Sequence, residues 1–265
     1  MDRNLKARVV TAALALPALF WLVGWSPSWI FSLAVLIITL GALREFFEMV
    51  FPHDRRHQSL GIIFGVALSA SVFLDAGPGW AALVFVGFFA AYLFAGDELT
   101  ERLRRLSLSV LGMIYGGFLL PQIVVIFRHP QGRAWTFWLL AVVMSGDTLA
   151  YFIGRRFGKR KLAPHISPGK TVEGAWAYMA GAVISGSAAA VLLFSQWNWA
   201  EVVLLSLAVG ILGQLGDLFE SLVKRAFAVK DASTLLPGHG GLLDRLDSLI
   251  FPAVFTSTYL KVFHP

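Results

Sequence analysis

The sequence predicts an all-α integral membrane protein. Of its 265 residues, 57% are hydrophobic and only 14% are charged, whereas soluble domains average about 45–50% apolar and about 25% charged residues. Nine Trp and 22 Phe supply the aromatic side chains that are enriched at membrane interfaces. The excess of apolar surface must face lipid, so we expect a single membrane domain built from about nine spanning helices.

Windows of roughly 20 apolar residues locate these helices, because a helix of that length crosses the hydrocarbon core of a bilayer. The nine predicted ranges are 8–24, 28–48, 59–76, 79–96, 106–127, 134–154, 173–194, 199–223 and 246–262. Arg3, Lys6 and Arg8 precede the first apolar run, as in a secretory signal, but the bulky run at 22–27 offers no small-residue cleavage site. We therefore keep the first range as a helix of the mature protein.

Lys and Arg residues are distributed unequally between the two sides of the predicted membrane. Nineteen of the 22 lie before the first helix or around the loops after the second, fourth, sixth and eighth helices, and only Arg128, Arg133 and Lys261 lie on the other side. Because loops rich in Lys and Arg stay in the cytoplasm, the pattern predicts a multi-pass protein of the cytoplasmic (inner) membrane, with its amino terminus inside and its carboxyl terminus outside. The loops after the sixth and eighth helices then share one face and can build one site.

The chain shows no internal repeat and no soluble domain. We expect residues 1–130 to form scaffold helices with contacts to a second copy, and residues 131–265 to form the catalytic helices. The absence of cysteine excludes disulfides, Cys-ligated zinc and thiol nucleophiles. The net charge of +6 comes from the basic loops, so we expect no nucleic-acid partner.

The segment Ser221–Ser248, called the motif stretch below, carries four basic residues, three Asp and one His between two apolar segments. One helical face leads into it, with polar side chains at i, i+3, i+4 and i+7: Asp217, Glu220, Ser221 and Lys224. A glycine-rich turn around His239 then interrupts regular structure, and Asp244 and Asp247 restart a helical face. The pattern predicts a cradle for a metal ion and phosphates. The alternative is a solvated loop, which would need neither these glycines nor Asp217 inside an apolar helix.

Asp147 and Asp217 lie well inside predicted membrane helices, where ionisable side chains are costly and usually functional. Asp147 precedes Arg155 by eight residues and Asp217 precedes Lys224 by seven, so each lies about 10 Å below the charged end of its helix. Small neighbours such as Gly146 allow close helix packing at this depth. The alternative is that each carboxylate pairs with an Arg and locks two helices together.

The loop between the sixth and seventh predicted helices carries six Lys and Arg residues within positions 155–170, called the basic loop below. Its S-P-G-K-T end resembles the end of a phosphate-binding loop, but Pro164 occupies the position of the first glycine and no strand is predicted before it, which excludes a P-loop. Lys170 and Thr171 can still meet a phosphate at the start of the next helix, whose first N–H groups favour anions. The alternative is that the loop binds anionic lipid headgroups.

The motif stretch resembles the signature of the phosphatidate cytidylyltransferases, also called CDP-diacylglycerol synthases. All fixed positions of that signature are filled, by Ser221, Lys224, Arg225, Lys230, Asp231, Ser233, Leu236, Pro237, His239, Gly240, Gly241, Asp244, Arg245 and Asp247. A long gapped pattern with this many polar positions is highly specific. The segment Ser167–Gly174 and the Gly-Asp pairs ending at Asp147 and Asp217 also resemble the family, so the resemblance covers roughly residues 140–250.

The resemblance implies a reaction of CTP with phosphatidate that yields CDP-diacylglycerol and pyrophosphate at the cytoplasmic face of the bilayer. It also implies Mg²⁺ held by Asp217 and Asp244, a second, monovalent cation such as K⁺, and a homodimer. The residues that we expect to carry catalysis are Asp147, Asp217, Lys224, Arg225 and Asp244. The residues that we expect to bind substrate and phosphate are Ser167, Lys170, Thr171, Ser221, Lys230, Asp231, His239, Gly240, Gly241, Arg245 and Asp247.

Two other function classes are alternatives. Another CTP-using lipid enzyme, such as a polyprenol kinase, would share substrates but release CDP instead of pyrophosphate. An ion-coupled transporter would use Asp147 and Asp217 as a cation relay, but the carboxylates gather towards one face and no repeat is visible. A CDP-alcohol phosphotransferase is disfavoured because the D-G-x2-A-R-x8-G-x3-D-x3-D pattern is absent.

Overall fold

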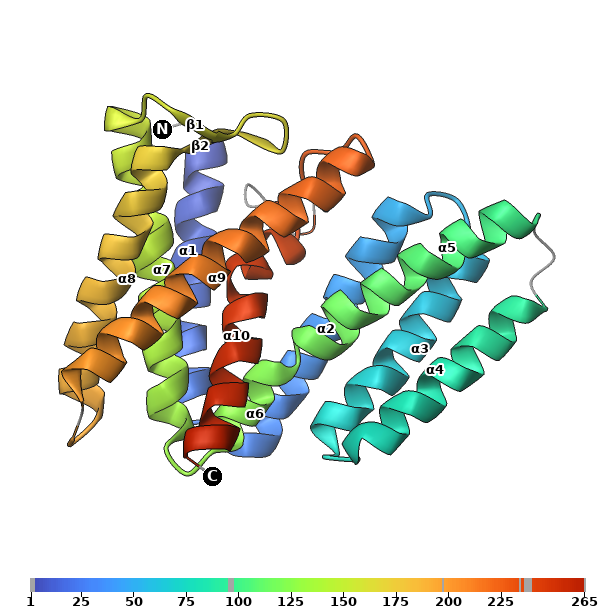
Figure 1. The fold of residues 1–265 in the computed structure, drawn as a ribbon, viewed down its shortest axis with the longest axis horizontal. Coiled ribbons are helices and arrows are strands. Elements are labelled where there is room, and N and C mark those ends of the chain that lie inside the picture. Colours follow the sequence, from blue (N-terminus) through green and yellow to red (C-terminus); the bar gives the residue numbers. More distant parts are fainter. Residues whose placement is uncertain (1–2, 95–97, 197, 234, 236–239, 265) are drawn as a thin grey trace. The chain divides into compact units, whose positions relative to one another are not determined.

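The structure is a computed structural model that describes residues 3–94, 98–196, 198–233, 235 and 240–264 (Figure 1). Helices dominate the described chain. In chain order they are α1 (Arg3–Gly24), α2 (Ser28–Val50), α3 (Arg55–Phe73), α4 (Gly77–Leu93), α5 (Leu99–Gly112), the π-helical turn η1 (Met113–Leu119), α6 (Gln122–Arg128), α7 (Gly132–Phe157), α8 (Val172–Leu193), α9 (Trp199–Ala226) and α10 (Leu243–Phe263). One short antiparallel hairpin, β1 (Lys161–Ala163) and β2 (Ser167–Thr171), joins α7 to α8.

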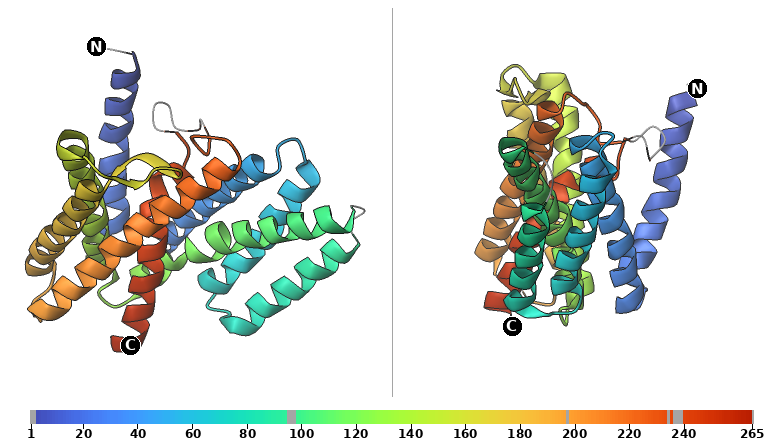
Figure 2. Two further views of the ribbon diagram at one scale, coloured as in Figure 1. Left: turned by 45° about the horizontal axis from the view of Figure 1, so that its top comes forward. Right: turned by 90° about the vertical axis from the view of Figure 1, so that its right-hand side faces the viewer.

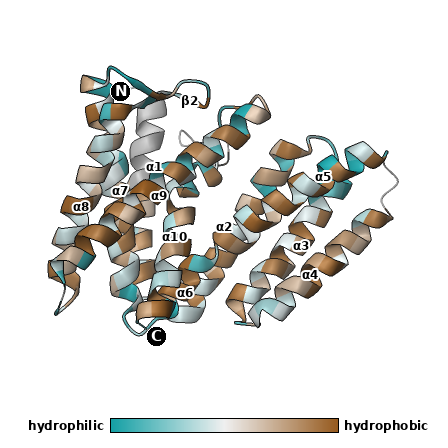
Figure 3. Cartoon of the chain, viewed as in Figure 1, coloured by the Kyte–Doolittle hydropathy of each residue, from teal (hydrophilic) through white to brown (hydrophobic). Residues whose placement is uncertain are grey.

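The predicted all-α membrane class is confirmed, and within the described residues helices occupy most of each of the nine predicted ranges, the fifth being divided among α5, η1 and α6. Among the described residues, five helical segments are long and apolar enough to cross a membrane: Ser28–Val50, Leu99–Arg128, Gly132–Phe157, Val172–Leu193 and Trp199–Ala226. Two further apolar helices, Ala13–Gly24 and Gly77–Leu93, are shorter. Nine spans therefore stay a prediction. In Figure 3 apolar residues cover much of the helical surface, whereas the hairpin region is largely polar.

The described helices divide into two compact units. The first comprises Met1–Val125 together with Asp231–Asp244, and the second comprises Ile126–Lys230 together with Arg245–Pro265. The middle part of the motif stretch therefore folds with the amino-terminal helices.

Close helix contacts build the first unit. A Cβ atom at Gly117 of η1 would lie 2.5 Å from the carbonyl oxygen of Gly65 of α3, so the two backbones approach this closely because residue 117 is glycine. Phe46, Phe47 and Phe88 fill the surrounding core. The Leu99–Arg128 segment begins seven residues before the predicted range, because its first turns are amphipathic and the apolar window missed them.

The second unit is organised by the α7–α8 pair, which lies side by side in Figures 1 and 2. Gly146 of α7 accommodates the Tyr178 ring of α8, and the Trp138 indole N–H donates to the Gly186 carbonyl at 3.0 Å. Thr171 caps α8 by accepting a hydrogen bond from the Gly174 N–H at 3.1 Å. The hairpin thus sits at the start of α8, one end of the unit.

The opposite end of the second unit is closed by aromatic and polar contacts. The Trp135 ring lies 5.0 Å from the Phe194 ring and 6.0 Å from the Tyr259 ring, centroid to centroid. His129 Nε2 lies 2.8 Å from the carbonyl oxygen of His264 near the carboxyl terminus. Because α7 has 26 residues and so spans about 39 Å, the hairpin and the end of α10 lie far apart along this unit.

Candidate active site

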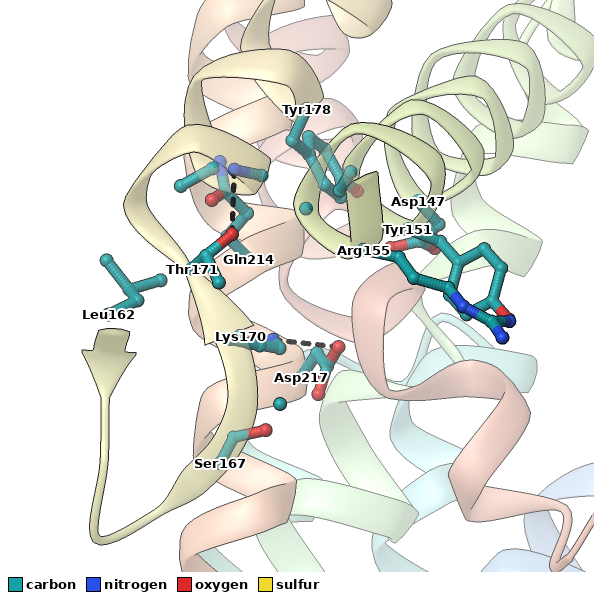
Figure 4. Close-up of a pocket in the computed structure, with 15 residues that line it drawn as sticks. Asp147, Tyr151, Arg155, Leu162, Ser167, Lys170, Thr171, Tyr178, Gln214 and Asp217 are labelled. Atoms are coloured by element: carbon teal, nitrogen blue, oxygen red, sulfur yellow. Dashed lines mark hydrogen bonds and ion pairs between the residues drawn. The ribbon is translucent and has the colours of Figure 1, made fainter. Parts of the chain in front are cut away.

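A pocket of about 440 Å³ opens in the second unit, between the hairpin and helices α7, α8 and α9 (Figure 4). We call it the polar pocket. Its charged and polar lining residues are Asp147, Tyr151, Arg155, Ser167, Lys170, Thr171, Tyr178, Gln214 and Asp217. Five of these were expected from the sequence to serve catalysis or substrate binding: Asp147, Ser167, Lys170, Thr171 and Asp217.

An ion pair crosses the polar pocket. Lys170 Nζ, at the end of β2, lies 2.8 Å from Asp217 Oδ2 of α9, and both side chains keep about a quarter of their surface exposed, 24% and 29%. Figure 4 shows the pair between the strand and the helix. Ser221 donates its hydroxyl to the other Asp217 oxygen at 3.3 Å. In this position Lys170 could bind an incoming phosphate, and Asp217 could bind the cation that accompanies it.

Asp147 contributes a second carboxylate to the polar pocket from α7. Its Oδ2 accepts a hydrogen bond from the Ser248 hydroxyl of α10 at 2.9 Å. The neighbouring Asp247 is buried and accepts from the Ser248 backbone N–H at 2.7 Å. Two carboxylates in one membrane-embedded pocket repel one another, and a bound cation would relieve that repulsion.

Two expected cationic residues on α9 have partners within the second unit. Lys224 and Glu220 are buried and form an ion pair of 2.8 Å. Arg225 is exposed, and its guanidinium lies near the carbonyl oxygens of Ile166 at 3.4 Å and Val229 at 3.2 Å. Arg225 therefore connects the hairpin turn to the carboxyl end of α9. Lys230 and Arg245 are exposed.

The expected residues of the first unit shape a loop. Asp244 Oδ2 accepts hydrogen bonds from the backbone N–H groups of Ala232 at 2.9 Å and Gly241 at 2.7 Å. Gly240 has φ +79°, a conformation that favours glycine. Asp231 is exposed, and His239, the histidine expected to bind phosphate, lies outside the described residues.

Sequence reasoning missed four polar lining residues: Arg155, which was counted only as part of the basic loop, and Tyr151, Tyr178 and Gln214. The Tyr178 hydroxyl is buried and has no hydrogen-bond partner among the described residues. Tyr178 and Gln214 both stand in predicted membrane helices, and a polar group at that depth is a signal of function that could have identified them. Tyr151 lies near the helix end, where tyrosine is common, and gave no such signal.

The chain matches a family model described as the cytidylyltransferase family over residues 6–263. It is 35% identical over 270 residues to the phosphatidate cytidylyltransferase of Brucella abortus, which covers 98% of this chain and 94% of the relative. Identity is 30% over 293 residues to the protein of that name from Synechocystis, with 97% of each chain covered. It is 41% over 157 residues to the one from Bacillus subtilis, with 58% and 57% covered. A match along nearly the whole length means that this chain belongs to the cytidylyltransferase family.

Proposed function

We propose that this protein transfers the cytidylyl group of CTP to phosphatidate and forms CDP-diacylglycerol and pyrophosphate. Family membership supports the nucleotide chemistry, and the names of the relatives support the lipid acceptor. The observation that carries the proposal to this chain is the polar pocket, where Lys170, Asp217 and Asp147 meet between apolar helices. Such a pocket suits a reaction between a water-soluble polyanion and a lipid phosphate.

The transfer requires little acid–base chemistry from the protein. A phosphate oxygen of phosphatidate attacks the α-phosphorus of CTP, a new P–O bond forms, and the bond to the bridging oxygen breaks as pyrophosphate leaves. The attacking phosphate monoester has a second pKa of about 6 and is largely dianionic at neutral pH. The main barrier is the approach of two polyanions, which positioning and charge neutralisation can lower.

The cations near the hairpin are suited to hold these phosphates. Lys170 would exchange Asp217 for a phosphate oxygen, and Arg155 lines the same pocket. The motif supports further phosphate contacts from Lys224, Arg225, Lys230 and Arg245, which remain proposals. Thr171 lies at the capped start of α8, where backbone N–H groups favour anions.

We also propose dependence on Mg²⁺. The polar pocket fits this ion, because Asp217 and Asp147 supply two carboxylates and Gln214 an amide, and Mg²⁺ is usually bound by one or two carboxylates together with substrate phosphates. The part of the chain that the structure describes holds no group of three His, Asp or Glu side chains placed to bind one metal ion, so the phosphates would complete the coordination. When bound, the ion supplies positive charge to the reacting phosphates. The resemblance of the motif stretch adds Asp244 as a further Mg²⁺ ligand. It also supports a second, monovalent cation such as K⁺ and a homodimer, and we include both in the proposal.

Substitution of Lys170 tests the role of the basic loop. Lys170→Ala should raise the apparent KM for CTP or phosphatidate about 10-fold or more, since a charge-assisted hydrogen bond is lost. Steady-state kinetics in neutral detergent micelles measure the KM values for CTP and phosphatidate. Lys161→Ala, an exposed residue of the same hairpin outside the pocket, is the matched control and should behave like the wild type. If Lys170→Ala instead keeps wild-type kinetics in micelles and loses activity only in bilayers, in step with their anionic lipid content, the basic loop binds lipid headgroups.

We propose that the protein lies in the inner membrane and that the site opens on its cytoplasmic face. The distribution of Lys and Arg supports this orientation, and α8 has 22 residues, which separate the hairpin from Ser195 by about 33 Å.

Cysteine labelling tests the orientation of the site in the membrane. The chain has no native Cys, so only an introduced Cys can react. In intact cells, Ser195→Cys should react with an impermeant thiol reagent, whereas Lys161→Cys should react only after permeabilisation. The reverse pattern would place the hairpin outside and remove the polar pocket from the cytoplasmic CTP pool.

The most direct functional assay is pyrophosphate release from CTP by purified protein. Release should require phosphatidate. Release of CDP with a polyprenol acceptor would indicate a kinase, and cation flux without turnover would indicate a transporter.

A further inference from the structure

Glu45 is a buried acidic residue of α2 that the proposed chemistry does not use. Its exposed fraction is 4%, and its chain neighbours Phe46 and Phe47 are among the fully buried core side chains. A buried carboxylate is unfavourable unless hydrogen bonds compensate for the lost water. The contacts of Glu45 therefore indicate why an acidic residue occupies this position.

Three donors among the described residues converge on the Glu45 carboxylate, and all come from the loop of the motif stretch. The Ser233 hydroxyl donates to Oε1 at 2.5 Å, and the Leu242 backbone N–H donates to the same oxygen at 2.8 Å. The Leu243 backbone N–H donates to Oε2 at 2.8 Å. Ser233 lies near the start of the loop, and Leu242 and Leu243 lie at its end. The Glu45 carboxylate therefore binds both ends of the loop.

The two backbone donors also mark the start of α10, which begins at Leu243. The first N–H groups of a helix have no partner within the helix and carry partial positive charge, so an acidic side chain is favourable there. Glu45 thus caps α10 from a helix 198 residues earlier in the sequence. The next residue of α10 is Asp244, the expected metal ligand.

Two glycines of the motif stretch are explained by this packing. A Cβ atom at Gly241 would lie 2.8 Å from Glu45 Oε2 and 2.9 Å from the Ser233 nitrogen. A Cβ at Gly240 would lie 2.9 Å from Asp244 Oδ2. The loop backbone therefore runs between two carboxylates, one from α2 and one from α10, with no room for larger residues.

We infer that Glu45 is a positioning residue for the cytidylyl transfer: it holds Ser233 and the first backbone N–H groups of α10, and thereby the orientation of Asp244. The inference rests on the proposed function and deepens it. It gives helix α2 a direct part in holding Asp244, beyond that of a scaffold. Glu45 itself is buried beneath the loop and acts only through the residues it holds.

A Gln at position 45 tests the inference with almost no change in volume. An amide has one acceptor oxygen, and its NH₂ group would face at least one donor, so one of the three hydrogen bonds is lost and a donor is left unpaired. Because small misplacements of catalytic groups are costly, Glu45→Gln should lower kcat about 10-fold or more while the KM for CTP changes by less than about 3-fold. Glu48→Gln is the matched control, since Glu48 lies on the same helix, is partly exposed and pairs with Arg44 at 2.7 Å; it should keep wild-type kinetics.

Hydrogen–deuterium exchange gives a readout that does not depend on activity. In Glu45→Gln, amides in the peptide covering 240–246 should exchange faster, while the peptides of α8 and α9 stay protected. Ser233→Ala removes one donor without touching α2 and should give a smaller effect of the same kind. In the double variant the two effects should not add, because the residues share one interaction.

Several results would overturn the inference. They are wild-type kcat in Glu45→Gln, unchanged exchange at 240–246, or a uniform rise in exchange over all helices, which would indicate loss of general stability. If Glu45→Gln does not fold, Ser233→Ala decides by the same measurements. Failure of the proposed reaction is distinguishable, because it would abolish turnover in the wild type while the local exchange difference persisted.

Discussion

Asp217→Asn should lower turnover by at least roughly 100-fold, the size of effect seen when one well-placed electrostatic group is removed from a reaction centre. The substitution keeps the side-chain volume but removes an anion that lines the polar pocket and pairs with Lys170 at 2.8 Å. If Asp217 binds Mg²⁺, the Mg²⁺ concentration for half-maximal activity should rise as well. Pyrophosphate release at saturating CTP, measured across a Mg²⁺ titration, gives both values.

The Mg²⁺ titration separates metal binding from a purely structural ion pair. Loss of the pair alone would leave Lys170 without its partner and lower activity without a change in Mg²⁺ requirement. Glu201→Gln, at the opposite end of α9, controls for removal of an acidic charge from the same helix and should keep most activity. Size-exclusion profiles check folding. Near-normal turnover of Asp217→Asn with an unchanged Mg²⁺ requirement would exclude Asp217 as a ligand.

Asp244→Asn should produce a comparable loss, again at least roughly 100-fold. Asp244 Oδ2 accepts two backbone hydrogen bonds, from Ala232 and Gly241, and the Asn oxygen can keep this acceptor role. The loop should therefore survive the substitution, and the loss would report the missing charge. Hydrogen–deuterium exchange at 240–246 checks that the loop is retained.

The double variant of Asp217 and Asp244 should be little worse than either single variant if both residues serve one centre, because residues that act as a unit have non-additive effects. Asp75→Asn, in an exposed turn of the first unit, is the control for an unrelated Asp and should be neutral. Multiplicative losses in the double variant would contradict a shared centre. Full activity of Asp244→Asn would remove Asp244 from the proposed site.

The helices could be predicted from sequence because their signal is local. Apolar runs of membrane length identified a helix in every predicted range. The hairpin β1–β2 was not predicted, since its strands are short, rich in Lys, Gly and Pro, and lack the alternation of polar and apolar residues that identifies a strand. The first turns of α5 were missed because their charged residues fall outside an apolar window.

Part of the lining of the polar pocket could be predicted from the sequence, but its geometry could not. Asp147, Lys170 and Asp217 stood out as ionisable groups in or beside membrane helices, and the structure brings them to one pocket. Their pairing could not be predicted, because the order of residues does not reveal which faces of α7, α9 and the hairpin meet. Glu45 was hidden for the same reason, since its partners lie 188 to 198 residues away.

The proposed transfer places the α-phosphate of CTP in the lipid, and the position of an isotope label tests this directly. Purified protein is incubated with phosphatidate, Mg²⁺ and CTP that is labelled either at the α-phosphate or at the γ-phosphate, and the lipids are then extracted. We expect the α-label to enter the organic phase as CDP-diacylglycerol, and the γ-label to stay in the aqueous phase as pyrophosphate in equal amount. Entry of the γ-label into lipid, with CDP left in the aqueous phase, would contradict it and identify a CTP-dependent lipid kinase.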